Sequence, residues 1–350
     1  MMNYRLPYVN NYINSVEMQK EYQKRQINKK SNGLGFYILF YFLSMNIIVI
    51  GVMFALAIFR PDLLETFDFN STPMYLMQIL ASVFAAFIPA LFYFMISNSS
   101  ISETIQVKFV KPGILIPIVL FAMAVCMLAN VAAELVSENF AIFGLENTLN
   151  MENSATSLFN NILYVISTAI VPAFAEEFAF RGVVLGSLRK YGDSLAIIAS
   201  AVMFGAMHGN IIQIPFAFIL GLLFGFVTCK TNSIVPAICI HFINNFYSVI
   251  FDIFQTNKVF SEDVFYIVYL SVVLFFCISG CLSLIYMMKK DKNFFKISDK
   301  SSDNSSINMY ASDVLTLKEK VKQFFLNAGV ILCLNIFAVE TVMFLGLVNV

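Results

Sequence analysis

The sequence predicts an all-α protein, built as a polytopic transmembrane helical bundle with its N-terminus in the cytoplasm. Its composition is the first reason, because 59% of the 350 residues are hydrophobic and only 13% are charged, against about a quarter charged in a typical soluble domain. The mean hydropathy of +0.77 agrees with this. A series of apolar runs and an alternating distribution of basic residues are the second and third reasons.

Nine apolar runs define the predicted spans. A membrane-spanning helix needs about 20 mostly apolar residues, and the fifth run falls short of this, so we expect about eight or nine transmembrane helices. The runs are 36–59, 74–96, 113–133, 158–175, 194–208, 211–229, 234–251, 264–288 and 327–349.

Basic residues support this enumeration. If the N-terminus is cytoplasmic, the predicted cytoplasmic segments hold 20 of the 22 Lys and Arg residues, and only Arg60 and Lys258 fall outside. Lys and Arg collect in cytoplasmic loops of multi-pass proteins. The asymmetry therefore favours this count and this orientation, in a cell membrane that we expect to be a bacterial plasma membrane.

The chain divides into four regions by composition. Residues 1–35 form a polar, basic cytoplasmic segment and residues 36–150 the N-terminal transmembrane helices. Residues 155–255 hold the candidate catalytic core, and residues 256–350 hold the C-terminal transmembrane helices with a cytoplasmic loop at 289–326. We expect residues 1–35 and the Ser-rich and Asp-rich loop to be mobile or surface-lying, and their charge to set orientation and contact lipid.

The sequence gives no sign of nucleic-acid binding, of a cysteine metal site or of a cleaved signal peptide. A formal net charge of zero gives no sign of nucleic-acid binding. The six cysteines lie in apolar runs without metal-ligand spacing, which predicts buried thiols. The first 35 residues are too long and too polar for a secretory signal peptide, so no cleavage is predicted.

Ionisable and amide side chains inside the predicted helices mark a candidate site. A charge at membrane depth is costly unless it is paired or faces water, so such residues are candidates for function. Apart from Glu340, which has no evident partner and is interpreted as an interfacial residue, all lie between residues 176 and 245. They are Glu176, Glu177 and Arg181 in "AEEFAFR", His208 in "FGAMHGN", and His241 and Asn245 in "HFINN".

Spacing assigns these residues to helix faces. Glu177 and Arg181 are four residues apart, so they can form an ion pair within the bilayer. The same spacing relates Phe204 to His208 and places Asn245 one turn after His241. Glu176 points about 100° away from Glu177 and need not share its ion pair. Nearby, Gly221 and Gly225 form a GxxxG motif, which predicts close helix contact within the bundle.

This set of groups fits the activation of water. A carboxylate in a poorly hydrated pocket can accept a proton from water, and a neighbouring histidine can orient that water or protonate a leaving amine. A second histidine and an amide can stabilise the oxyanion that forms when water attacks a carbonyl. These are the components of an amide hydrolase without a covalent nucleophile.

The three motifs also resemble a known family. "EEFAFR" matches EExxxR, "FGAMH" matches FxxxH and "HFINN" matches HxxxN, in the order found in the CPBP family of intramembrane proteases. This family includes the type II CAAX prenyl endopeptidases and bacteriocin-processing or immunity proteins. The resemblance covers about residues 155–255 and implies a glutamate-dependent intramembrane endopeptidase that acts on a membrane-embedded or membrane-anchored peptide.

The resemblance also implies a role for each motif residue. Glu176 is the expected general base with assistance from His208, and His241 and Asn245 are expected to bind the oxyanion. The supporting residues are Glu177, Arg181 and Phe204. No cofactor is expected; the alternative is zinc held by Glu176, His208 and His241.

Two other functions remain open from the sequence. A transporter coupled to protons or cations also places Glu and His side chains inside the membrane. A catalytically silent immunity factor of the same fold would keep the motifs without turnover. The absence of an internal repeat speaks against many secondary transporters, and the concentration of ionisable groups in three stretches favours the protease.

Overall fold

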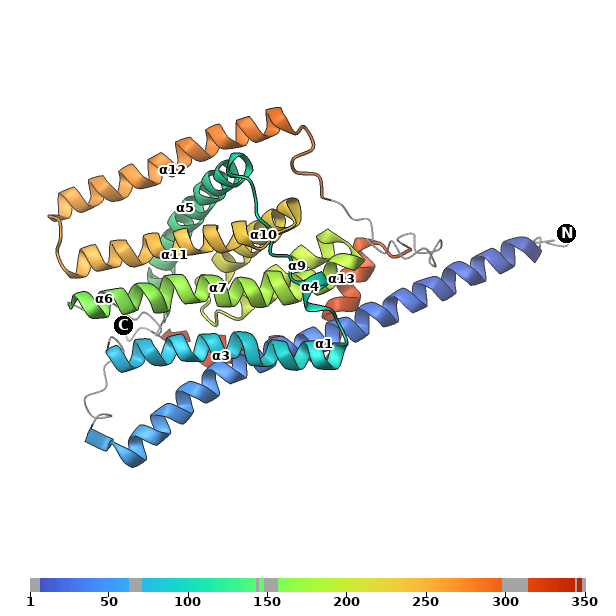
Figure 1. Ribbon diagram of the computed structural model, residues 1–350, viewed down its shortest axis with the longest axis horizontal. Coiled ribbons are helices and arrows are strands. Elements are labelled where there is room, and N and C mark those ends of the chain that lie inside the picture. Colours follow the sequence, from blue (N-terminus) through green and yellow to red (C-terminus); the bar gives the residue numbers. More distant parts are fainter. Residues whose placement is uncertain are drawn as a thin grey trace.

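The computed structural model describes residues 7–62, 71–142, 145–147, 157–297, 314–343 and 345–347. These residues form a helical bundle, confirming the all-α prediction (Figure 1). The described part also contains one short antiparallel pairing between β1, Leu145–Asn147, and β2, Leu345–Leu347.

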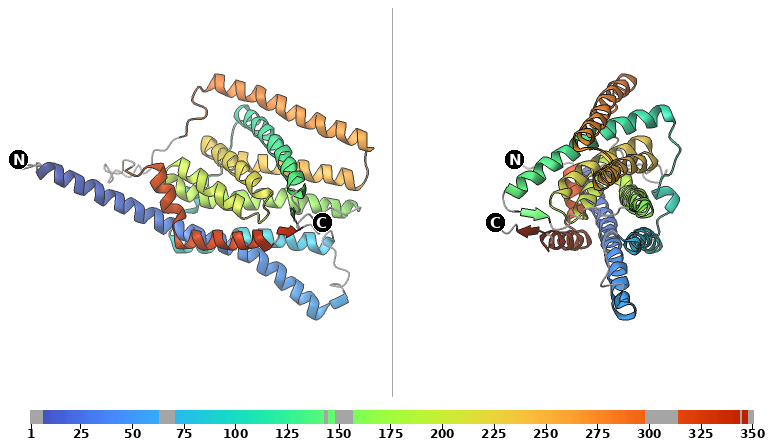
Figure 2. Two further views of the ribbon diagram at one scale, coloured as in Figure 1. Left: turned by 180° about the vertical axis from the view of Figure 1, so that it is seen from behind. Right: turned by 90° about the vertical axis from the view of Figure 1, so that its left-hand side faces the viewer.

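The bundle has three layers. One outer layer contains α5 packed on α12, and the opposite layer contains α1 packed on α3 and α14 (Figures 1 and 2). The helices between them carry the candidate site residues. The outer helices are α1 (Pro7–Phe59), α3 (Thr72–Ser97), α4 (Ile101–Thr104), α5 (Pro112–Ile142), α12 (Glu262–Lys290), α13 (Leu317–Phe325) and α14 (Ala328–Met343). The central ones are α6 (Leu158–Val165), η1 (Ile166–Ile170), α7 (Val171–Glu177), η2 (Phe178–Leu185), α8 (Gly186–Leu188), η3 (Arg189–Tyr191), α9 (Asp193–Ala206), α10 (Gln213–Thr231) and α11 (Val235–Thr256).

Seven of the described helices are long and apolar enough to cross a membrane. Helices α13 and α14 pass the same test together as a pair bent by 68°, which raises the number to eight. The segments α6 to η3 form one continuous span, Leu158–Tyr191. The chain is therefore a multi-pass helical membrane protein, as the sequence predicts.

The fifth apolar run does not form a full span. It forms α9, which has 14 residues and reaches only about 21 Å at 1.5 Å per residue, less than the bilayer core of about 30 Å. Helix α9 packs along α10, and the guanidinium of Arg189, just before α9, donates to Asn232 Oδ1, just after α10, at 2.6 Å. The two helices therefore form a hairpin that returns the chain to the end of the bundle from which it started.

Residues 7–35 differ from the peripheral segment that the sequence suggests. They are helical and continue without a break into the first apolar run as α1. Ile27 and Leu34 are buried, and Asn327 at the start of α14 donates from its Nδ2 to the backbone oxygen of Asn28 at 2.7 Å. Contacts with α13 and α14, about 300 residues away in the sequence, hold the later turns of this segment, from Ile27 onward, in the bundle.

Candidate functional site

The span Leu158–Tyr191 carries the glutamate pair at a change of helical geometry. Two π-helical segments, η1 and η2, flank the α-helical turns that contain Glu176 and Glu177. A π-turn widens the helix and rotates the side chains that follow it, and such turns are frequent at functional sites. Here the side chain of Glu177 is fully buried, whereas Glu176 lines a cavity.

Glu177 and Arg181 form the ion pair that their spacing predicts. Arg181 Nη1 donates to Glu177 Oε1 at 2.7 Å, and neither side chain is exposed. Arg181 also donates from Nη2 to the backbone oxygen of Gly221 at 3.3 Å, and its guanidinium carbon lies 4.3 Å from the ring centre of Phe204. A buried charge needs such compensation, because a buried ion pair repays its desolvation only when further polar contacts satisfy it.

His241, on α11, is anchored by the same carboxylate. The distance from its Nδ1 to Glu177 Oε1 is 2.9 Å. A carboxylate only accepts, so Nδ1 carries a proton and donates it to Glu177. This leaves Nε2 directed to the side of Glu176, 4.0 Å from its Oε2. Glu177 therefore fixes both the orientation and the tautomer of His241, as outer carboxylates do for functional histidines.

His208 lies in the turn that connects α9 to α10. Its Nδ1 lies 2.8 Å from the backbone oxygen of Phe204, so this nitrogen is protonated and donates. The free Nε2 of a neutral His208 can therefore accept a proton. The Phe204 ring packs edge-on against both His208 and His241, with centroid distances of 4.9 and 6.0 Å. Phe204 thus contacts both histidines and Arg181, which gives a packing role to the first residue of the FxxxH motif.

Asn245 lies one helical turn after His241 on the same helix. Its Nδ2 donates to the backbone oxygen of Thr168 in η1 at 3.2 Å, and its Oδ1 accepts from Asn244 Nδ2 at 3.4 Å. An amide group has two N–H donors, so the bond to Thr168 leaves one for another acceptor. These contacts lock the amide across two helices.

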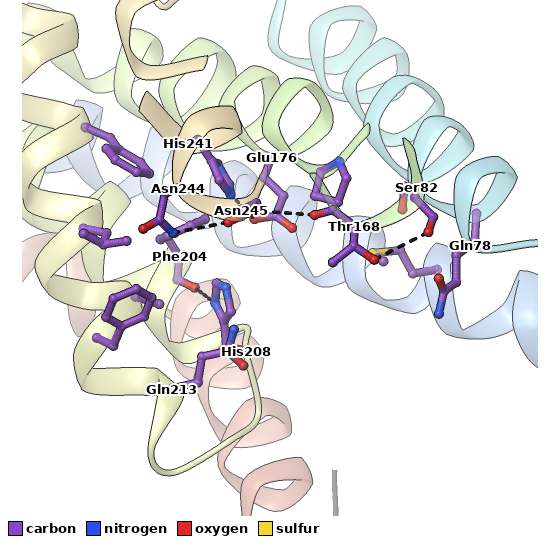
Figure 3. A pocket seen from close by; sticks show the side chains of 18 of the residues that line it. Gln78, Ser82, Thr168, Glu176, Phe204, His208, Gln213, His241, Asn244 and Asn245 are labelled. Atoms are coloured by element: carbon purple, nitrogen blue, oxygen red, sulfur yellow. Dashed lines mark hydrogen bonds and ion pairs between the residues drawn. The ribbon is translucent and has the colours of Figure 1, made fainter. Parts of the chain in front are cut away.

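One cavity of about 390 Å³ brings the candidate residues together (Figure 3). Glu176, Phe204, His208, His241 and Asn245 all line it. Apolar side chains from α1 and α10 complete much of its wall. The cavity therefore combines convergent polar groups with an apolar lining, as ligand-binding sites commonly do.

Several polar residues of this cavity were not singled out in the sequence. Gln78 and Ser82 on α3 are four residues apart, a spacing that would have placed them on one face of a predicted span. The remaining ones had no distinguishing pattern. They are Ser167, Thr168, Gln213 and Asn244.

Glu340 also lies closer to the site than the sequence suggests. Its Cδ and Oε2 atoms are 3.0 Å from the position that a Cβ on Gly209 would occupy, next to His208. The described part of the chain offers no hydrogen-bond partner to Oε2. Glu340 thus contacts the loop that carries His208, and its interpretation as an interfacial residue stays a prediction.

A protein metal site needs several converging donor side chains. Within the described ranges, no group of three or more His, Cys, Asp or Glu side chains has an arrangement that could hold a metal ion. The expectation of a metal-free site, with zinc on Glu176, His208 and His241 as its alternative, stays a prediction that activity measurements with a chelator can test.

These features define a class of protein: a multi-pass helical membrane protein with a carboxylate, two imidazoles and an amide around an internal cavity. Residues 158–247 match the family described as type II CAAX prenyl endopeptidase Rce1-like. The match supports the CPBP resemblance over these residues. No curated protein and no solved structure shows significant similarity to the chain.

Proposed function

We propose that this protein is a glutamate-dependent intramembrane endopeptidase that hydrolyses a peptide bond in a membrane-embedded or membrane-anchored peptide. The observation that supports the proposal is the single cavity in which Glu176, His208, His241 and Asn245 converge. The similarity of residues 158–247 to the type II CAAX prenyl endopeptidase family also supports it.

Glu176 is the proposed base. Its carboxylate accepts a proton from a water molecule, whose oxygen forms a bond to the carbonyl carbon of the substrate. The tetrahedral intermediate then collapses, the C–N bond breaks, and the proton passes to the amine nitrogen. His208, with Nδ1 engaged by Phe204, presents Nε2 for the orientation of the water and for this proton transfer.

His241 and Asn245 are proposed to stabilise the oxyanion. The free N–H of the Asn245 amide is available to donate, since only the bond to Thr168 engages that nitrogen. His241 already donates from Nδ1, so Nε2 donates to the oxyanion only when the imidazole is doubly protonated. Glu177 holds the imidazole in this orientation, which makes Glu177 a positioning residue for the reaction.

The apolar part of the cavity lining suits a membrane-associated substrate. Met45 and Val49 of α1 and Leu220 of α10 give it an apolar side, next to the polar groups of α7 and α11. The ionisable side chains that line this cavity surround one space. This arrangement suits a reaction at one point better than the relay of protons or cations across the membrane that a transporter needs. We place the protein in the plasma membrane of a bacterium, with maturation of peptides or bacteriocins as its biological setting.

Cleavage of internally quenched peptides by the purified, full-length protein in nanodiscs tests the proposal. Prenylated and plain peptides of the same sequence separate the two substrate classes. We expect Glu176→Gln to lower kcat by about 10³-fold, the scale of general base catalysis, while the exposed control Glu262→Gln leaves it unchanged. Cleavage at the wild-type rate in Glu176→Gln would show that the base is another group.

A chelator added to the same assay tests the expectation of a metal-free mechanism. We expect activity to survive prolonged incubation with 1,10-phenanthroline. Complete loss that added zinc restores would instead assign Glu176, His208 and His241 as metal ligands.

A further inference from the structure

A second cavity, of about 750 Å³, lies at the end of the bundle where α3, α8 and α10 end. It shares no lining residue with the candidate active site. Its walls come from α1, from the segment between α3 and α5, and from the segment between η2 and α9. The lining is predominantly polar and comprises Lys30, Asn98, Ser99, Ser100, Glu103, Thr104, Gln106, Gly186, Ser187, Arg189, Lys190, Asp193 and Asn232.

The cavity is lined by three basic side chains, Lys30, Arg189 and Lys190, and by two acidic ones, Glu103 and Asp193, so one positive charge is in excess. Arg189 is already engaged, because it forms an ion pair with Asp193 at 2.9 Å. Lys30 and Lys190 have no acidic side chain within ion-pair distance in the described part of the chain. Lys30 and Lys190 line the same cavity, so their like charges repel each other.

Neutral donors surround the two lysines. Lys30 Nζ itself donates to Ser99 Oγ at 2.8 Å, which holds the half-buried ammonium at the cavity wall. Hydroxyl and amide groups of Asn98, Ser100 and Ser187 lie on the same lining. Two unpaired cations among such groups form a site for a phosphate, since an anion between them would remove their mutual repulsion.

The surface next to the cavity is apolar. Met95 and Ile96, at the end of α3, are 73% and 81% exposed, and Ile101 is 51% exposed. These residues flank the polar stretch 98–100 in the sequence. In a membrane protein, exposed apolar side chains at the end of a span contact acyl chains, so the cavity lies where a lipid headgroup meets its tails.

We propose that this cavity binds the phosphate headgroup of an anionic phospholipid, with Lys30 and Lys190 as its cationic contacts. The acyl chains extend along the apolar end of α3. The location agrees with the positive-inside expectation, which assigns this end of the bundle to the cytoplasmic leaflet, where basic pockets between transmembrane helices bind anionic lipids.

Native mass spectrometry of the full-length protein, released from detergent with added lipid, tests the proposal. We expect one phosphatidylglycerol to be retained and phosphatidylcholine not to be retained. The double variant Lys30→Gln/Lys190→Gln should bind phosphatidylglycerol about 25-fold more weakly, at about fivefold for each basic contact. The control Lys289→Gln/Lys290→Gln removes the same charge from exposed positions at the end of α12 and should bind as the wild type does.

Three results would overturn the proposal: unchanged retention in the cavity variant, equal losses in both double variants, or competition by millimolar inorganic phosphate as effective as that by lipid. The last of these would identify a site for free phosphate. If the double variant does not fold, Lys190→Gln alone, at an exposed position, and the charge-conserving Lys30→Arg replace it, with weakened and retained binding expected respectively. The readout is lipid binding, so it does not depend on peptide cleavage.

Discussion

Glu177 Oε1 is the atom on which the buried part of the site depends. It accepts from Arg181 on the same helix and from His241 on α11, whose position in the sequence is 64 residues away. One carboxylate therefore neutralises a buried guanidinium and orients a candidate oxyanion donor. The charges are protected from water by Phe204 and Phe224, whose rings lie 4.3 and 5.0 Å from the guanidinium carbon.

Replacing only one partner of this ion pair should lower the free energy of unfolding more than replacing both partners. Arg181→Met leaves the Glu177 carboxylate without its guanidinium, and we expect it to lower the free energy of unfolding by about 3–5 kcal/mol. Glu177→Gln/Arg181→Met leaves no buried charge, and the loss should be smaller by about 2 kcal/mol or more. Equilibrium unfolding in mixed detergent micelles measures both.

The exposed pair of Glu21 and Lys24 provides the matched control. Its atoms approach to 2.7 Å, as in the buried pair, but its side chains are 61% and 36% exposed. Glu21→Gln/Lys24→Met should leave the free energy of unfolding nearly unchanged, because exposed ion pairs contribute little to stability. Equal destabilisation by Arg181→Met and by the buried double variant would contradict the proposed electrostatic role.

The sequence predicted contacts within one helix better than contacts between helices. The spacing of Glu177 and Arg181 was sufficient to predict their ion pair, because helix geometry alone brings such residues together. The bond from His241 to Glu177 and the bond from Asn245 to Thr168 depend on how α11 packs against the span Leu158–Tyr191. Residue spacing contains no information on that packing, so the participation of Thr168 was not predictable.

At the scale of the helix, close packing of α9 on α10 determines where His208 lies. A Cβ on Gly221 of α10 would lie 2.8 Å from the Cα of Ala201 on α9. The prediction that the GxxxG motif marks close helix contact within the bundle is thus confirmed. Because the turn after α9 carries His208, the separation of these two helices sets its position relative to Glu176.

Gly221→Ala should therefore separate the two helices and destabilise the protein. We expect a loss of about 1–3 kcal/mol in the free energy of unfolding, the usual cost of overpacking. Gly51→Ala in α1 is the matched control, because a Cβ there meets no atom within 4 Å, and it should be neutral or slightly stabilising. Identical unfolding curves for Gly221→Ala and the wild type would show that the contact relaxes without cost.

Two features of the helices could not be predicted from the sequence: the π-helical segments and the packing of the N-terminal part of α1. The two π-helical segments around Glu176 have no recognisable pattern in the apolar sequence. The N-terminal part of α1 is polar, which favoured a peripheral segment. Its burial depends on partners near residue 327 that sequence periodicity does not reveal.

At the scale of the whole molecule, the basic residues of the loops collect at one end of the bundle. Two hydrogen bonds connect the segments at this end. Arg189 donates to the side chain of Asn232, and Lys230 donates to the backbone oxygen of Asn293, after α12. The connection between α11 and α12, which contains Lys258, lies at the opposite end (Figure 1). The α9–α10 hairpin explains why the charge asymmetry persists although α9 is too short to span: it returns the chain to the same end, as two full spans would.

This arrangement predicts the orientation of the protein in the membrane. Lys258→Cys should react with a membrane-impermeant maleimide in intact cells, whereas Lys296→Cys, after α12, should react only after permeabilisation. The six native cysteines lie within helices, so the wild type provides a low background. The opposite labelling pattern would reverse the orientation. It would also place Lys30 and Lys190 at the outer leaflet, away from the anionic cytoplasmic leaflet whose negative surface potential attracts basic residues.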